Sequence, residues 1–349
     1  MSVRRASTAE LSNWLQHVSE NPDGGNVLQL TQFAAVKELS GWKAEYLIWQ
    51  DRLAILALSR SIPFLGKIWY LPKGPGLTNV DEMAAFIPEL KTFAREQGVF
   101  LLKVEPEILR DQDGVVAQSM KGFGLTKAAD IQAASTVIVN LEPPIDKVFS
   151  AFPQPGRYAI NRAKRDEGIA IAVDTTPETI DIAYRMLAET AAAGGFRIRP
   201  KDYYELFWGG YSAAGLGQMF FAKHGEQVIA IAYVIVLGEK ASYKDGASVK
   251  ERPVYGASHL LQWQAMQWAK EQGALSYDLT GAPPSEQLHN NEHPLHGLVS
   301  FKTSFNKQVT DYVGVYDLVL NARSKKLWDQ IGYRLARRVH NRKRNEVYW

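Results

Sequence analysis

The sequence predicts an α/β protein built from two similar domains, each a mixed sheet flanked by helices. The segment AREQG at 94–98 returns as AKEQG at 269–273, in the other half of the chain. An aromatic residue precedes each copy, and an apolar, strand-like run follows it at 99–104 and at 274–279. Hairpin-like segments come before both copies and another strand-like run comes later, so the two halves repeat one order of elements.

Each repeated segment has the features of a helix end. Its residues are good helix formers, and Gly98 or Gly273 then supplies the left-handed conformation that commonly ends a helix. The apolar run that follows has the length of a buried strand. We therefore expect a helix, a glycine turn and a buried strand in each half.

The first half, residues 1–144, is expected to form one domain. Its pattern predicts, in order, a helix at 31–39, strands at 43–49, 52–60 and 67–71, a helix at 80–97, a strand at 99–104, a helix from Pro106 and a strand at 134–141. The glycines and the proline of 73–76 require a loop. Pro143 and Pro144 mark the boundary, because two prolines stop a strand and stiffen a linker.

Residues 145–320 are expected to form the second domain. Its pattern predicts, in order, a helix at 158–167, a strand at 169–173, a helix at 177–193, strands at 218–223, 227–237 and 240–247, a helix at 257–272, a strand at 274–279, a polar loop at 281–297, a short helix and a strand at 308–315. Thr176 caps the helix that starts at Pro177. A meander, a helix and then a strand is the order of the acyltransferase fold whose best-known members use acetyl-CoA.

Composition limits the class of protein. The chain has 349 residues, 46% of them hydrophobic, and no cysteine. This length suits two domains with sizeable cores, and the lack of cysteine excludes disulfides, thiolate nucleophiles and sulfur ligands for zinc. The longest apolar run, 228–237, is too short to span a membrane, and the first residues lack the apolar core of a secretory signal. We expect a monomeric, cytoplasmic protein.

Residues 321–349 are predicted to form a basic amphipathic helix. Nine Lys or Arg stand against two acids between Arg323 and Trp349. Four aliphatic residues recur at every fourth position, on one stripe of such a helix; they are Leu327, Ile331, Leu335 and Val339. The helix either packs on the body, with its cations favoured by the helix dipole, or contacts anionic lipid or RNA phosphate. Both interpretations can hold together.

The phosphate loop of acetyl-CoA enzymes is only partly present. In those enzymes a loop of the form Arg/Gln-x-x-Gly-x-Gly/Ala precedes a helix and binds pyrophosphate through backbone N–H groups. The corresponding residues, 252–257, read RPVYGA. Tyr255 stands where the backbone should approach phosphate closely, which disfavours CoA binding.

A series of motifs runs through both halves in one order. They are Gln32-Phe33 with Lys37, KGP at 73–75, VEPE at 104–107, the segment 158–168, GFRIR at 195–199 before Tyr203-Tyr204, GASHLLQWQAM at 256–266, WAK at 268–270, YDL at 277–279 and FKTSF at 301–305. Together they resemble the Fem family (FemABX), the non-ribosomal peptidyltransferases that add amino acids from aminoacyl-tRNA to the cross-bridge of peptidoglycan precursors. The resemblance implies tandem acyltransferase-like (GNAT-type) domains. It also implies the short form, because 145–320 has no room for the helical arm of longer members.

The resemblance further implies an activity and its partners. The expected enzyme is an aminoacyltransferase that moves glycine, alanine or serine from aminoacyl-tRNA to the amine of the third stem-peptide residue. The acceptor is a UDP-linked or a lipid-linked muropeptide precursor, and aminoacyl-tRNA is a co-substrate, so no cofactor is expected. The basic tail, 323–349, favours an acceptor near the inner face of the plasma membrane.

Lys302 is the first candidate catalytic residue. The reaction is aminolysis of an ester, in which negative charge develops on the carbonyl oxygen, and a fixed ammonium stabilises that charge. The resemblance implies that Phe301 and Lys302 lie at the acceptor end of tRNA, with Phe301 stacked on the terminal adenosine. The alternative is a surface lysine beside a core phenylalanine.

Four further residues are expected to bind substrate through the same resemblance. Lys37 and Arg199 align with positions that hold the phosphates of the precursor, where Lys offers a point charge and Arg a bidentate fork. Glu105 aligns with a carboxylate that accepts the substrate ammonium or relays its proton. Tyr243 aligns with a substrate-contacting tyrosine, and Asp245 stands where short members carry a second tyrosine. The alternatives are a solvated surface charge or an ion pair at Lys37 and at Arg199, and a helix-capping acid at Glu105.

Two other functions stay open. A CoA-dependent N-acetyltransferase would use the same fold, and CoA would then raise the melting temperature. A non-catalytic RNA-binding protein would keep the duplicated fold and bind tRNA whether charged or not. His289, His293 and His296 share a polar loop, but without a nearby acid cluster we expect no metal site there.

Overall fold

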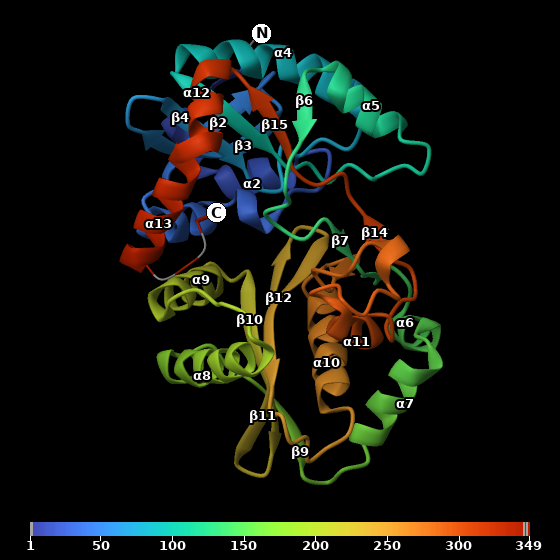
Figure 1. Cartoon of the computed structure of the whole chain (residues 1–349). Helices are drawn as coiled ribbons and strands as arrows, with labels where there is room; N and C mark the ends of the chain where they lie inside the picture. Colours follow the sequence, from blue (N-terminus) through green and yellow to red (C-terminus); the bar gives the residue numbers. More distant parts are fainter. Residues whose placement is uncertain (1–2, 345, 347) are drawn as a thin grey trace. The chain divides into compact units, whose positions relative to one another are not determined.

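The computed structural model describes residues 3–344, 346 and 348–349, and the chain divides into two compact units (Figure 1). Unit 1 consists of Met1–Ala134 and Asp311–Trp349, and unit 2 is Ser135–Thr310. Each unit has its own sheet and its own hydrophobic core, as expected of a domain.

A seven-stranded sheet forms the centre of unit 1, in the order β1-β2-β3-β4-β5-β15-β6. Its strands are β1 (Val3–Arg5), β2 (Lys43–Trp49), β3 (Leu53–Ile62), β4 (Gly66–Leu71), β5 (Val99–Val104), β6 (Leu125–Lys127) and β15 (Tyr316–Val319). Strands β1 to β4 pair antiparallel, β5 lies parallel to β4, and β15 is antiparallel to β5. A parallel neighbour needs a crossover connection, which α4 (Val80–Glu96) supplies.

A six-stranded sheet forms the centre of unit 2, in the order β8-β13-β12-β11-β10-β9. Its strands are β8 (Ile138–Asn140), β9 (Ile169–Val173), β10 (Gly217–His224), β11 (Gln227–Leu237), β12 (Lys240–Ser248) and β13 (Ser276–Asp278). Strands β9 to β12 pair antiparallel, β13 lies parallel to β12, and β8 is antiparallel to β13. The crossover between β12 and β13 is α10 (Ala257–Glu271).

The two sheets share one topology, so the predicted duplication is confirmed. Each has an antiparallel run of four strands, a crossover helix, a strand parallel to the fourth and an antiparallel strand beside it. Gly98 (φ +73°) and Gly273 (φ +95°) follow the two crossover helices in the left-handed conformation. Residues with a Cβ seldom adopt this conformation, which explains why both copies of the repeated segment end in glycine.

The two units exchange one strand each. β8 follows the strands of the first sheet in sequence but pairs within the sheet of unit 2. β15 follows the strands of the second sheet in sequence but pairs within the sheet of unit 1. The structure therefore divides the chain after Ala134 and after Thr310, not at the predicted bounds of 1–144, 145–320 and 321–349.

Pro143 and Pro144, which predicted the domain boundary, precede a helix of unit 2 instead. Pro144 is the N-cap of α6 (Ile145–Ala151) in unit 2. Proline is tolerated at a helix start because the first backbone N–H groups have no partner within the helix. The two prolines therefore mark the start of a helix, and Pro144 lies ten residues after Ala134, where the first segment of unit 1 ends.

Helices flank both sheets. Unit 1 has α1 (Thr8–Ser12), α2 (Trp14–Ser19), α3 (Thr31–Leu39), α4, α5 (Val115–Gly122), α12 (Ala322–Leu327) and α13 (Tyr333–Arg344), the last two joined by the π-helical turn η4 (Trp328–Gly332). Unit 2 has α6, α7 (Gln154–Ala163), α8 (Pro177–Gly194), α9 (Lys201–Ala213), α10 and α11 (Val299–Lys302). Single-turn 3-10 helices are η1 (Val27–Gln29), η2 (Ser285–Gln287) and η3 (His296–Leu298), and β7 (Ser135–Thr136) pairs with β14 (Thr310–Asp311). Along the described chain, no helix combines the length and the apolar character that crossing a bilayer requires.

Three local predictions differ from the structure. The helix expected from Pro106 does not form; α5 begins at Val115, where the Asp111 carboxylate accepts the Val115 N–H at 2.6 Å. Helix α9 is absent from the prediction, although its buried aromatic residues have helical spacing, i, i+3, i+4 and i+7; they are Tyr204, Phe207, Trp208 and Tyr211. The last predicted strand, 308–315, is replaced by β14 and β15.

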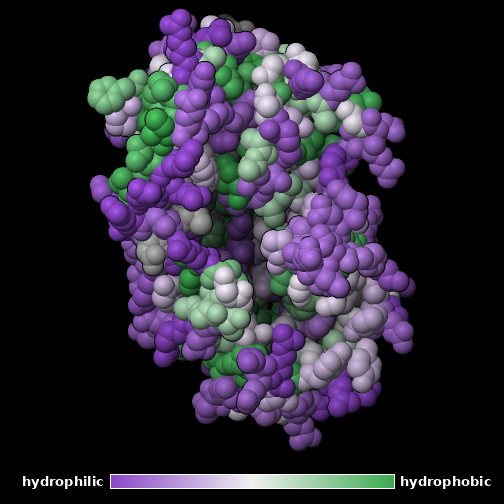
Figure 2. Space-filling model, viewed as in Figure 1, coloured by the Kyte–Doolittle hydropathy of each residue, from purple (hydrophilic) through white to green (hydrophobic). Residues whose placement is uncertain are grey.

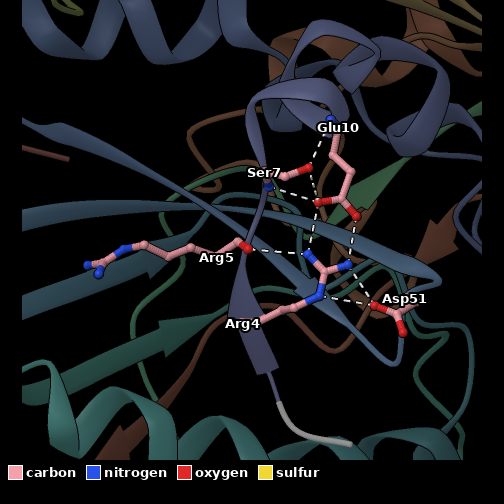
Figure 3. A network of polar contacts seen from close by, with 5 residues as sticks. All are labelled: Arg4, Arg5, Ser7, Glu10 and Asp51. Carbon is pink, nitrogen blue, oxygen red and sulfur yellow. Dashed lines mark hydrogen bonds and ion pairs between the residues drawn. The ribbon is translucent and has the colours of Figure 1, made fainter.

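A network of charged groups holds the short first strand of unit 1 (Figure 3). The Arg4 guanidinium lies 2.6 Å from a carboxylate oxygen of Glu10 and 2.6 Å from one of Asp51. Ser7 and Glu10 also form a capping box at the start of α1. The hydrogen bonds from Arg4, and then those from Ser7, hold the pKa of Glu10 far below its usual range. β1 is thus tied to the β2–β3 turn and to the first helix.

Candidate active site

Lys302 is the last residue of α11, and its side chain is buried in unit 2. The residue is 4% exposed, and its Nζ donates to the backbone oxygens of Thr280 and Gly281. Thr280 (φ +46°) and Gly281 (φ +82°) both take left-handed conformations, and this turn presents two successive carbonyl oxygens to one ammonium. The alternative of a surface lysine is therefore wrong.

Burial determines the charge state of Lys302. Desolvation lowers the pKa of the ammonium to about 8, while Asp278 raises it and Lys244 lowers it further. Lys302 thus lies within electrostatic range of one residue on β13 and one on β12. Near neutral pH, a little below this pKa, the Lys302 side chain is mostly protonated and positively charged.

The surroundings of Lys302 lie where β12 and β13 part. These parallel strands pair only from Lys240 to Ser242 on β12, whereas β12 continues beside β11 to Ser248. Lys244 is the extra residue of a bulge in β12, between the pairs that Tyr243 and Asp245 make with β11. Bulges bend a strand and redirect its side chains.

Asp278 fixes the turn that holds the lysine. Its carboxylate accepts the hydroxyl of Thr136 and, at 2.7 Å, the backbone N–H of Thr280. Asp278 therefore both orients the carbonyl oxygens that bind Lys302 and places a negative charge near the ammonium.

Phe301 belongs to an aromatic group beside the lysine. Its ring lies edge-on to His259 at 4.9 Å between centroids and to Phe305 at 5.5 Å. Burial lowers the pKa of His259 to about 4, and the charge of Arg252 lowers it further, so this imidazole is neutral near pH 7. Phe301 is half-buried and packs as a partner of the core.

Tyr243 and Asp245 flank the bulge. A Cβ built on Gly246 would lie 1.8 Å from the Tyr243 hydroxyl oxygen, so glycine makes room for this tyrosine. Asp245 accepts the Trp208 indole N–H at 2.9 Å. Burial raises the pKa of Asp245, and burial together with the Asp245 charge raises the pKa of Tyr243.

Arg199 reaches the same region through α9. Its guanidinium lies 5.4 Å from the centroid of the Tyr203 ring. Burial, followed by the charge of Asp245, raises the pKa of Tyr204, and the backbone and charge of Arg199 oppose this rise. Arg199 is half-buried whereas Arg197 is exposed. Arg199, Tyr243 and Lys302 all belong to unit 2.

Glu105 lies in unit 1, at the end of β5, with no exposed surface. Its carboxylate accepts the Tyr70 hydroxyl at 2.5 Å and the Gln132 N–H at 2.9 Å. Burial raises the pKa of this carboxyl, against the opposing charge of Lys73. No helix follows at Pro106, so Glu105 is not the cap of such a helix.

Lys37 also lies in unit 1, on α3, and is 1% exposed. Its Nζ is 5.9 Å from the ring centroids of both Phe33 and Trp42. Trp42 in turn packs on Tyr348 and Trp349. Lys37 is therefore not a solvated surface charge, and a phosphate reaches its ammonium only if neighbouring side chains move.

The glycine at the start of α10 lies against another helix. Gly256 is left-handed (φ +84°), and a Cβ built on it would lie 2.1 Å from the backbone oxygen of Ala159 on α7. The glycine thus permits close helix packing, and Tyr255 beside it is 58% exposed. Among the described residues, no group of three or more His, Asp or Glu is placed to hold a metal ion.

Comparison with known proteins decides the family. The model of the FemAB family matches residues 8–216, more than half of the chain. The chain is a member of the FemAB family. The model of the acetyltransferase (GNAT) domain matches residues 156–287, which lie within unit 2 and include β12 and β13.

Relatives of this FemAB family member cover nearly its whole length. The "Lipid II:glycine glycyltransferase" of Staphylococcus aureus strain MRSA252 is 23% identical, over 92% of this chain and 94% of the relative. The protein of the same description from strain USA300 is 22% identical over the same shares.

Solved structures share the fold. The crystal structure of FemX matches with a TM-score of 0.80 at 18% identity, over 95% of this chain and all of that one. The C-terminal domain of a putative lysylphosphatidylglycerol synthetase from Agrobacterium fabrum matches with a TM-score of 0.54 at 14% identity, over 93% and 97% of the two chains. The fold is thus a tandem of acyltransferase-like domains, as the sequence predicts.

The sequence predictions missed Lys244, Asp278 and Thr136 as members of the site. Asp278 had a readable signal, because a lone carboxylate interrupts the mostly apolar run 274–279 within the YDL motif. Lys244 and Thr136 had none, since a bulge in β12 places the first near Lys302 and the folding of β7 into unit 2 places the second at the turn.

Proposed function

We propose that this FemAB family member is a tRNA-dependent aminoacyltransferase. It moves a small amino acid (glycine, alanine or serine) from aminoacyl-tRNA to the stem-peptide amine of a peptidoglycan precursor. Family membership and the glycyltransferase descriptions of its Staphylococcus aureus relatives support the reaction class. The buried ammonium of Lys302 is the observation that carries the mechanism.

The reaction forms an amide at the expense of an ester. The acceptor amine attacks the aminoacyl carbonyl carbon, a C–N bond forms, and the bond from that carbon to the tRNA ribose oxygen breaks. The amine loses one proton and the leaving ribose oxygen gains one. The carbonyl oxygen becomes negative on the way, and a pre-oriented cation in a water-poor site stabilises it with little reorganisation.

Lys302 suits this role because its ammonium is already fixed. Two backbone carbonyl oxygens hold Nζ and leave one N–H direction for a ligand, since an ammonium has three donors. Burial in a medium of low dielectric strengthens its action on a developing negative charge. Asp278 and the bulge at Lys244 position the strands around it.

The remaining roles follow from the predicted alignment. Phe301, beside the lysine on α11, is only half-buried and would stack on the terminal adenosine. Tyr243 would contact the acceptor, Arg199 and Lys37 would contact its phosphates, and Glu105 would accept a proton or bind the substrate ammonium.

The decisive experiment measures product mass after incubation of the protein with charged total tRNA and a UDP-linked muropeptide. Lys302→Met keeps most of the side-chain volume and removes the charge, and we expect it to slow transfer about 100-fold or more. Lys270→Met is the matched control, because Lys270 also donates to backbone oxygens of unit 2, those of Leu141 and Glu142.

The control separates chemistry from folding. Lys270→Met should transfer at a near wild-type rate, with any loss explained by its melting temperature. A near wild-type rate in a folded Lys302→Met variant would remove Lys302 from the mechanism. Unchanged precursor binding in both Lys37→Ala and Arg199→Ala would remove these two residues from the acceptor site.

The match to the acetyltransferase (GNAT) domain keeps CoA-dependent N-acetylation as a second candidate. The close approach of Gly256 to α7 and the exposed Tyr255 weigh against it. CoA or acetyl-CoA should leave the melting temperature unchanged. A rise that grows with CoA concentration would favour acetyl transfer instead.

A further inference from the structure

The C-terminal helical segment turns a row of aliphatic side chains toward solvent. Leu327, Ile331, Leu335 and Val339 are 50%, 57%, 53% and 52% exposed. Another side of the segment is the packed one: Trp328 and His340, each about 100° around the helix from the neighbouring member of the row, are buried and both contact Tyr348. The row is therefore not the face with which the helix docks on unit 1.

The π-helical turn keeps this row aligned. In an α-helix, residues four apart rotate by about 40° relative to one another, so a row at every fourth position drifts around the helix. The wider turn η4, Trp328–Gly332, reduces this drift between α12 and α13.

A hairpin tip of unit 1 extends the same surface. Phe64, in the turn between β3 and β4, is 106% exposed and has a left-handed φ of +65°. The neighbouring Leu65 side chain would lie 3.5 Å from a Cβ built on Gly332, so the tip sits beside η4. We call Phe64 and the four aliphatic residues the apolar ridge. Figure 2 shows hydrophobic residues gathered over this region, with hydrophilic ones beside them.

The ridge is bordered by positive charge. Seven exposed cations lie on α12 and α13, namely Arg323, Lys326, Arg334, Arg337, Arg338, Arg342 and Lys343. Asp329, the one acid between 323 and 344 in the sequence, is paired with Lys325 at 2.5 Å. Helical geometry puts Arg338 and Arg342 on one flank of Leu335 and Val339, and Lys343 on the other.

We propose that the apolar ridge and its cations dock this protein on an anionic lipid bilayer. A basic helix with an exposed apolar face binds by burying that face at the headgroup level while its cations meet anionic lipid. A fully exposed phenylalanine on a protruding turn adds an anchor. RNA phosphate would use the cations but not the aliphatic row, so the ridge favours lipid.

This inference goes beyond the proposed function and does not depend on it. A docked enzyme would meet a lipid-linked acceptor at the bilayer surface, whereas bilayer binding itself requires no turnover. Binding and transfer are measured separately, so the failure of one leaves the other standing.

The test is flotation of the full-length protein with vesicles of phosphatidylcholine, with or without about one-third phosphatidylglycerol. We expect binding to the anionic vesicles that weakens with salt, and little binding to the neutral ones. Ile331→Ser with Leu335→Ser should weaken binding about tenfold for each side chain. Arg338→Gln with Arg342→Gln should weaken it about 30-fold in total.

Matched controls identify the surface. Leu11→Ser with Leu15→Ser removes two leucines of unit 1 that are 39% and 40% exposed, outside the ridge, and binding should persist. Because the chain has no cysteine, Phe64→Cys carries a single polarity-sensitive dye, whose emission should shift to the blue on anionic vesicles.

Three results would overturn the proposal. The first is a failure of the protein to float with anionic vesicles at low salt. The second is equal vesicle binding by the wild type and by the ridge variant (Ile331→Ser with Leu335→Ser) when the two have the same melting temperature. The third is a dye at position 64 whose emission does not shift when the protein is bound to vesicles. The surface would instead bind nucleic acid if the wild type bound RNA but not vesicles. RNA binding should then fall in the arginine variant (Arg338→Gln with Arg342→Gln) but not in the ridge variant.

Discussion

At the scale of single residues, Lys302 combines burial, charge and fixed geometry. The residue is 4% exposed and two backbone oxygens hold its ammonium, while desolvation lowers its pKa to about 8. Such perturbed groups are enriched at functional sites. Glu105 and Asp245 also have pKa values raised by burial, and their carboxylates accept hydrogen bonds from Tyr70 and from Trp208.

The lowered pKa of Lys302 predicts how activity depends on pH. If the ammonium form acts, transfer should fall about tenfold for each pH unit above about 8. Deprotonation of the acceptor amine raises the rate at lower pH, so the profile should be bell-shaped. Any residual activity of Lys302→Arg should lack the alkaline fall, because guanidinium stays charged. A wild-type rate that keeps rising to pH 10, corrected for ester hydrolysis, would contradict this role.

The same titration should be visible in stability. Between about 8 and the ordinary lysine value of 10.5, the unfolded state keeps a proton that the folded state releases. The free energy of unfolding therefore gains up to about 3 kcal/mol from this group as pH rises through that window. Urea unfolding of wild type and of Lys302→Met should diverge there and run in parallel below pH 7.

At the scale of elements, one glycine conformation serves two purposes. Gly273 is left-handed in open space and ends α10. Gly256 is left-handed at the start of the same helix, where α7 lies against it. Local sequence predicts the first, because a helix end needs a residue without strain at positive φ. Only packing explains the second.

These two glycines make a matched pair for substitution. Gly273→Ala should cost roughly 1–2 kcal/mol in the free energy of unfolding, the strain of a left-handed alanine. Gly256→Ala adds a collision with the Ala159 backbone oxygen and should cost roughly 1–3 kcal/mol more, as overpacking does. Equal costs in urea unfolding would show that α7 moves away freely.

At the scale of the whole molecule, the exchanged strands define what can fold alone. Unit 2 needs β8 beside β13, and Val137, Val139 and Leu141 around β8 belong to its core. Unit 1 needs β15 beside β5, and Leu318 belongs to the core of that unit. Each unit therefore depends on a segment that the sequence order assigns to the other.

The exchange predicts which fragments are stable. Residues 135–310 should fold and unfold cooperatively on heating, because they contain all six strands of the second sheet. Residues 145–320, the fragment with the boundaries first predicted, lack β8 and should be aggregated or without a sharp transition by circular dichroism. Comparable cooperative melting of the two fragments would argue against a structural role for the exchange.

The sequence by itself determined the duplicated fold and the identity of the central lysine. Periodicity, glycine turns and the AREQG repeat are local signals, and each reports short-range preferences of the backbone that the folded chain keeps. The motif at 301–305 indicated Lys302 because that pair is contiguous in sequence. The catalytic roles of Lys302 and Phe301 stay predictions, as do the substrate contacts of Lys37, Arg199, Glu105 and Tyr243.

Only the tertiary structure decided the strand exchange, the surroundings of Lys302 and the orientation of the apolar ridge. Strand partners are chosen by long-range pairing, so β8 and β15 fit either sheet as far as local sequence is concerned. The pKa of Lys302 depends on its burial and on the charges of Asp278 on β13 and Lys244 on β12, which surround the lysine only when those strands assemble. A row of aliphatic residues on a helix can face a core or face solvent, and local sequence does not distinguish the two. Here the side that carries Trp328 and His340 is buried, and the aliphatic row faces solvent.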